Sequence, residues 1–128
     1  MLLDPFIYRM AELRAEDGHL VFGVNIDQYI KTLLSHKTHA IVSNGIQVGG
    51  AVMSGDRFHI AIIPEFRGMV SFQIVRAVEW GLSISNPFKA IVRKDRSEVR
   101  RLIDFFPNKL VGQDDNTLTF EIKPRGML

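Results

Sequence analysis

The sequence predicts a single α+β domain in which a mixed, mainly antiparallel sheet carries helices on both faces. Residues 38–63 contain three consecutive strand patterns joined by two short turns. The last of them, 58–63, leads directly into a helical pattern at 68–82, and another strand pattern follows at 89–92. A strand, a crossover helix and a second strand predict a parallel pair, because a right-handed crossover returns the chain to the same sheet. We expect this pair, 58–63 and 89–92, to be splayed around the turn at 64–68.

Composition supports one globular domain. Of the 128 residues, 46% are hydrophobic and 23% are charged, and we expect 1–128 to form one domain. No stretch approaches the roughly 20 apolar residues of a membrane span, and the N-terminus lacks the basic segment of a secretion signal. We therefore expect a soluble, cytoplasmic protein with no membrane partner.

The charged and metal-binding residue types exclude several functions. There is no cysteine, and the four histidines lack metal-ligand spacing, so no metal site is expected. The formal net charge of +2 is small, which argues against nucleic-acid binding. A basic cluster at 93–101 is interpreted first as a solvated helix face and second as a contact for an acidic partner.

The N-terminal half contains one ambiguous segment and several clear ones. Asp4-Pro5 has the form of a helix start, whereas 6–10 also has the pattern of an opening strand. Residues 25–34 carry one apolar helix face. Asn44-Gly45 is a strong hairpin signal between the strands 38–43 and 46–53. In the second of these strands, Gly49-Gly50 indicates a bulge or a close backbone approach.

The C-terminal third predicts a helix and a hairpin. Asp95 or Ser97 can cap a helix that ends before Pro107. A terminal hairpin follows, with strands at 109–111 and 117–122.

The junction between the 58–63 strand and the 68–82 helix is the main candidate site. Pro64 ends the strand, and a turn at 64–68 leads into the helix. Such a junction places free N–H groups and the positive end of the helix dipole beside the strand end. The sequence therefore predicts an anion-binding site here.

The run Ile60-x-Ile62-x-Pro64-Glu65-Phe66-Arg67-Gly68 resembles the central motif of the GCN5-related N-acetyltransferases, abbreviated GNAT. In that family a strand ending in hydrophobic-x-Pro is followed by Arg-Gly-x-Gly-x-Gly/Ala and a helix. The likeness in element order extends over roughly residues 38–123. The resemblance also favours the strand interpretation of 6–10, followed by a helical segment at 15–21.

The resemblance implies acetyl-coenzyme A as the cofactor, with its pyrophosphate on backbone N–H groups of the turn and its pantetheine arm along the strand end. It also implies that the basic cluster at 93–101 could contact the coenzyme's 3′-phosphate. The implied cofactor-binding residues are Ile62, Ile63, Arg67, Gly68, Met69, Val70, Ser71 and Asp95.

Three positions depart from the family pattern. Val70 and Phe72 stand where the family has glycine, and Leu102 stands where it has a general-acid tyrosine. If the pocket is intact, Val70 and Phe72 are expected to point into the core. Otherwise Phe72 is expected to fill the space of the pyrophosphate.

An acetyl transfer to an amine also needs a route for the amine's proton. The candidate general bases are Glu65, His59 and Glu79. The alternatives are a structural role for His59 and a solvated position for Glu65, and Trp80 is expected in the core.

Two functions remain open from the sequence. One is a divergent acetyl-CoA-dependent N-acetyltransferase whose acceptor is an amine on a small molecule or a protein. The other is a non-catalytic structural or interaction protein with the same fold. Small proteins with such altered motifs resemble ones encoded by bacteriophages, which suggests a virion or host-takeover role. A homo-oligomer is also left open.

Overall fold

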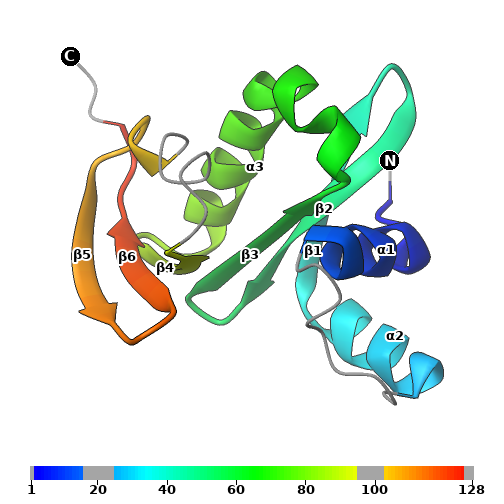
Figure 1. The fold of residues 1–128 in the computed structure, drawn as a ribbon, viewed down its shortest axis with the longest axis horizontal. Coiled ribbons are helices and arrows are strands. Elements are labelled where there is room, and N and C mark those ends of the chain that lie inside the picture. The colour runs from blue at the N-terminus through cyan, green and yellow to red at the C-terminus, as the bar shows by residue number, and fades with distance from the viewer. Residues whose placement is uncertain (1, 16–24, 95–102, 126–128) are drawn as a thin grey trace.

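In the computed structural model, which describes residues 2–15, 25–94 and 103–125, six strands form one sheet in the order β1-β2-β3-β4-β6-β5 (Figure 1). The strands are β1 Lys37–Ser43, β2 Ile46–Ser54, β3 Arg57–Ile62, β4 Phe88–Arg93, β5 Asn108–Gln113 and β6 Thr117–Ile122. The helices are α1 Pro5–Ala15, α2 Ile26–Ser35, the 3-10 helix η1 Pro64–Met69 and α3 Ser71–Ile84. No described helix is long and apolar enough to cross a membrane.

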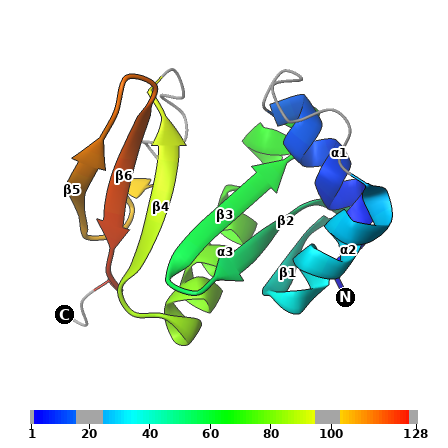
Figure 2. The same cartoon turned by 90° about the horizontal axis from the view of Figure 1, so that it is seen from below.

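The sheet is antiparallel apart from the central pair, β3 and β4, which run parallel. Their register pairs only Arg57 with Lys89 and Phe58 with Ala90. Beyond these residues the two strands diverge toward their C-terminal ends (Figure 2). The predicted fold class, including the splayed parallel pair, is therefore confirmed.

The sheet separates two hydrophobic cores because side chains alternate between its faces. On β3, Phe58 and Ile62 belong to the core under α3, whereas Ala61 belongs to the core under α1. Phe58 also stacks on Phe88, with the ring centroids 4.7 Å apart. Helices thus cover both faces of the sheet, as predicted.

The N-terminal segment is a helix, so the strand interpretation of 6–10 is wrong. An Asp4 carboxylate oxygen accepts the N–H of Phe6 at 2.9 Å, and the Asp4 carbonyl accepts that of Tyr8 at 3.1 Å. The buried Gln47 side chain binds the N–H and C=O of Asp4 at 2.7 and 3.1 Å. Local capping and this tertiary anchor together select the helix. Of the segment 15–21, only Ala15 lies within the described residues.

Both alternatives proposed for Gly49-Gly50 occur. The β1–β2 register pairs Ile41 with Gly49 and Val42 with Gln47, so Val48 is the extra residue of a bulge beside the glycines. A Cβ on Gly49 would overlap the Ala61 carbonyl oxygen, which no side chain tolerates. β2 can therefore pass this close to β3 only with glycine at position 49.

The predicted 68–82 helix starts later than expected. Pro64 opens a 3-10 helix in which the N–H of Phe66 binds the Ile63 carbonyl at 2.9 Å. Val70, with φ −125° and ψ 21°, interrupts this helix, and α3 begins at Ser71. Most of the expected helix before Pro107 lies outside the described residues.

Replacing Gly49 with alanine tests the close approach of β2 and β3. We expect Gly49→Ala to lower the free energy of unfolding by about 1–3 kcal/mol, because the added methyl group overlaps a backbone carbonyl. Gly112→Ala is the matched control, since a Cβ there meets Thr119 at an ordinary 3.7 Å. Urea denaturation measures the free energy of unfolding of both variants. Equal losses would contradict the close approach of β2 and β3 at Gly49.

Candidate functional site

The N-terminus of α3 is an uncapped helix end. Val70 at the N-cap position provides no side-chain hydrogen bond, and the first turn contains no acidic residue. The N–H groups of Ser71, Phe72 and Gln73 therefore lack intrahelical acceptors. No carboxylate of that turn offsets the helix dipole, so this end attracts an anion.

The space in front of this helix end is open. Gly68 is exposed, and a Cβ built on it would meet nothing within 4 Å. Gly68 also does not adopt the left-handed conformation that favours glycine. The fold itself therefore does not require glycine at position 68, whereas a ligand approaching the backbone would.

The two bulky residues of the altered motif point in different directions. Val70 is fully buried, as expected for an intact pocket, but Phe72 is 66% exposed, so the expectation of a core position is wrong for Phe72. The reason is helix geometry: Val70 and Ile74 face the core, and a residue two positions after Val70 is rotated by about 200°. The Arg76 guanidinium lies over the Phe72 ring, 4.7 Å from its centroid.

The edge of β3 that faces β4 carries backbone groups with no partner on β4. Alternate residues of a strand direct their N–H and C=O groups to opposite neighbours. Ile63 donates its N–H to the Val48 carbonyl on β2 at 2.8 Å, so the groups of Ile60 and Ile62 face β4. Because the β3–β4 pairing stops at Phe58, these groups border the splay.

The alternating direction of the backbone groups along β3 changes which of its residues are expected to bind the cofactor. Ile62 presents its backbone to the splay, whereas the N–H of Ile63 is already bound by β2. Ile60 presents its backbone in the same way as Ile62 and was missed as a binding residue. The signal was in the sequence, since residues two apart on a strand share an edge.

Five further predicted cofactor residues lie at the junction itself. Arg67, Gly68 and Met69 belong to η1, Val70 joins the helices, and Ser71 begins α3. The structure thus brings them beside the C-terminal end of β3. Asp95, the remaining predicted cofactor residue, lies outside the described residues.

The three candidate bases are not brought together. Glu65, on η1, forms an ion pair with Arg14 of α1, and this hydrogen bond lowers the pKa of Glu65. Glu79 is exposed on α3, two turns beyond Ser71. His59 is on β3 itself, next to the splay.

The environment of His59 lowers its pKa and so favours the neutral imidazole. Its pKa is lowered first by partial desolvation and then by the positive charge of Arg57 and the nearby His36. On the strand, His59 alternates with Phe58 and Ile60, which face α3, so His59 points to the opposite face. A neutral imidazole in that position can accept a proton.

Trp80 packs against the core under α3 but is only partly buried. Its other contact is His39 of β1, whose ring stacks on the indole with the centroids 5.2 Å apart. Burial lowers the pKa of His39. Trp80 is therefore part of the α3–β1 packing rather than of the junction.

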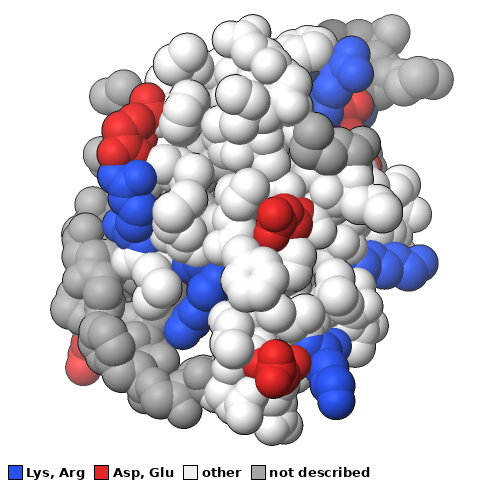
Figure 3. All heavy atoms as spheres, turned by 90° about the vertical axis from the view of Figure 1, so that its right-hand side faces the viewer, with Lys and Arg blue, Asp and Glu red and all other residues white. Residues whose placement is uncertain are grey.

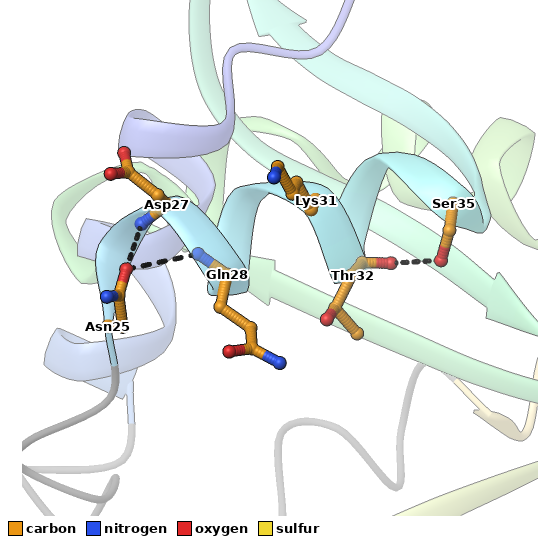
Figure 4. A pocket seen from close by; sticks show the side chains of 6 residues that line it. All are labelled: Asn25, Asp27, Gln28, Lys31, Thr32 and Ser35. Carbon is orange, nitrogen blue, oxygen red and sulfur yellow. Dashed lines mark hydrogen bonds between the residues drawn. The ribbon is translucent and has the colours of Figure 1, made fainter.

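A surface hollow of about 560 Å³ runs along α2, away from the junction. The residues that line it are all of polar or charged types, and Gln28 and Thr32 point to the same side of the helix (Figure 4). The Asn25 side chain is occupied in capping α2, accepting the N–H groups of Asp27 and Gln28. Among the described residues, no three His, Asp or Glu side chains are placed to hold a metal ion.

No protein-family model and no curated protein matches this sequence. Solved structures do match. An acetyltransferase of the GNAT family from Streptococcus pneumoniae superposes with a TM-score of 0.64 at 15% identity, covering 98% of each chain. The chain has a GNAT fold. A mutant of spermidine N-acetyltransferase SpeG from Vibrio cholerae matches with a TM-score of 0.67 at 14% identity, over 94% of this chain and 92% of that one.

The GNAT fold is also shared with N-acetyltransferase PseH from Campylobacter jejuni in complex with acetyl coenzyme A. That match has a TM-score of 0.56 at 13% identity and covers 90% of each chain. At these identities the likeness establishes the GNAT fold and leaves the chemistry to be argued from the site.

Paired substitutions test the orientation of the two bulky motif residues. We expect Val70→Ala to lower the free energy of unfolding by about 2 kcal/mol, because it leaves a cavity in the core. Phe72→Ala should cost less than about 1 kcal/mol, since it removes only an exposed ring and its contact with Arg76. Chemical denaturation measures the free energy of unfolding of both variants. A larger loss for Phe72→Ala than for Val70→Ala would contradict this orientation.

The His39–Trp80 stack predicts a pH-dependent signal. Because burial lowers the pKa of His39, the unfolded chain binds the proton first as the pH falls below about 6.5. Stability should therefore decrease below that pH and level off under the folded pKa. Trp80 is the single tryptophan, so its emission should report a transition centred below pH 6.5. His39→Gln should abolish the transition. A transition that persists in this variant would show that protonation of His39 is not its cause.

Proposed function

We propose that this protein is a divergent GNAT acetyltransferase that transfers an acetyl group from acetyl-CoA to an amine. The observation that carries the proposal is one junction with two complementary features. The open helix end at Gly68–Ser71 suits a phosphate group, and the unpaired backbone of Ile60 and Ile62 suits an extended arm that can pair with a strand.

The residues present fit acetyl-CoA. The N–H groups of the first turn of α3 would hold its pyrophosphate, with Gly68 allowing the close approach. The β3 edge at Ile60 and Ile62 would pair with the amides of the pantetheine arm. Val70 does not obstruct this path, because its side chain is in the core. When bound, acetyl-CoA supplies an acetyl group activated as a thioester.

His59 is the best placed of the three candidate bases. It lies on the strand that borders the splay, and its lowered pKa favours the neutral form that accepts a proton from the amine. Glu65 is held by Arg14, and Glu79 is remote from the junction. Leu102 cannot donate a proton, so solvent must protonate the departing thiolate.

Leu102 is also the observation that favours the second candidate function. A site without a general acid is compatible with a non-catalytic GNAT-fold protein that serves a structural or interaction role. Cofactor binding and turnover separate the two functions, because a non-catalytic relative would show no transfer to any amine.

Gly68→Ala tests the cofactor site with little effect on the fold. We expect the affinity for acetyl-CoA to fall about tenfold or more, because the methyl group would occupy the approach to the backbone N–H groups, while stability stays within about 0.5 kcal/mol. Calorimetric titration measures the affinity, and Gly112→Ala is the control. Absence of binding by the unaltered, folded protein would instead support the non-catalytic function.

His59→Gln tests the proposed base. In an acetylation assay with a panel of amines at pH 7, we expect the turnover rate to fall about 100-fold with cofactor affinity unchanged. The deficit should shrink as the pH rises and the amine loses its proton without help. An unchanged rate would rule out His59 as the base.

A further inference from the structure

No described helix covers the C-terminal half of the sheet face opposite α3. In Figure 2, the ribbons of β4, β6 and β5 face the viewer with no described helix in front of them, and α3 lies behind the sheet. The helices α1 and α2 pack on the other half, on β1, β2 and β3. A ligand can therefore reach the splayed strands from this face.

One row of charged residues crosses this face from β3 to β5. The register pairs Arg57 with Lys89, Lys89 with Glu121, and Glu121 with Lys109. Their neighbours along the strands, Phe58, Ala90 and Phe120, belong to the core under α3. Because side chains alternate, the four charged residues point to the face opposite α3.

The row has an excess of positive charge. Its one acid, Glu121, is flanked by two lysines and lies 3.9 Å from the Lys123 amine. Lys89 approaches an Asp56 carboxylate at 3.9 Å, and both side chains are about half exposed, so this pair contributes little. Within the described parts of the chain, no ion pair engages Arg57 or Lys109.

The basic end of the row lies at the proposed reaction site. Arg57 and Lys89 form the first of the two paired positions, one residue before β3 and β4 diverge. His59 follows Arg57 on the same face, close enough for the Arg57 charge to help lower the pKa of His59. The opposite face is filled by α3 and its core. An amine that approaches His59 therefore passes beside Arg57 and Lys89.

We propose that the acceptor is a small primary amine that carries an anionic group, a carboxylate or a phosphate, and that Arg57 and Lys89 bind this group. This inference rests on the proposed function, because it names the acceptor of the same site. Opposite charge attracts such an acceptor, whereas a polyamine is repelled. The surface on the α1–α2 side offers no comparable excess of positive charge, because acidic and basic side chains are interspersed there (Figure 3).

Matched small amines test the proposal by direct binding. Isotope-labelled protein is titrated at low ionic strength with O-phosphoethanolamine, β-alanine, ethanolamine and spermidine, and backbone amide shifts are followed by NMR. We expect one or both anionic amines to shift the signals of Arg57, His59 and Lys89. The affinity should exceed that of ethanolamine about tenfold and should weaken with added salt. The two anionic amines distinguish a phosphate from a carboxylate.

Single charge removals provide the control. Arg57→Gln and Lys89→Gln should each weaken anionic-amine binding about fivefold. Lys37→Gln, an equal change of charge on the edge strand β1, should leave it unchanged. Shifts caused by spermidine, by no amine, or equally by ethanolamine would overturn the proposal, as would an equal effect of Lys37→Gln.

An acetylation assay with the same amines separates this inference from the proposed function. Preferred transfer to the anionic amines supports both. Preferred transfer to spermidine would overturn the acceptor class while leaving the acetyltransferase in place. Anion binding at this row without any binding of acetyl-CoA would remove the proposed function and, with it, the acceptor role.

Discussion

The parallel pairing of β3 and β4 stops after two residue pairs, and the site depends on this constraint. Had the ladder continued, Ile60 and Ile62 would have satisfied their backbone groups on β4, and no edge would remain for a ligand. The splay leaves that edge beside the start of α3, because the chain leaves β3 through η1 directly into the helix. One interruption in the sheet thus places unpaired backbone, an open helix end and His59 on the same short segment.

The rest of the fold holds that segment in position. Glycine at position 49 lets β2 approach β3 closely, and Gly50 leaves room for Leu3 and Tyr8 of the N-terminal segment. The Arg14–Glu65 ion pair joins α1 to η1. Burial of Val70 anchors the point where η1 ends and α3 begins. These contacts keep one face of the splayed strands filled by α3, and no described helix covers the other face beside the basic row (Figure 2).

Most of the sheet was predictable because its signals are local. Asn44-Gly45 adopts the positive φ values, 52° and 80°, that a tight hairpin requires. The alternating run from Phe58 to Ile62 likewise identifies a strand with two different faces. The N-terminal segment was mispredicted because the apolar residues from Phe6 to Met10 fit the period of a strand as well as that of a helix. The contact that decides for the helix is not local, since the buried Gln47 side chain that anchors Asp4 comes from β2, far along the chain.

The sequence by itself determined the fold class, the strand–turn–helix junction and the residues that compose it, because hydrophobic period and turn chemistry act between near neighbours. Only the tertiary structure decided what those residues present to a ligand. Val70 faces inward and Phe72 outward because α3 begins at Ser71 and docks on the sheet in one rotation. The row from Arg57 to Lys109 exists only because strand order and register bring residues from four strands into line, and no local pattern encodes that alignment.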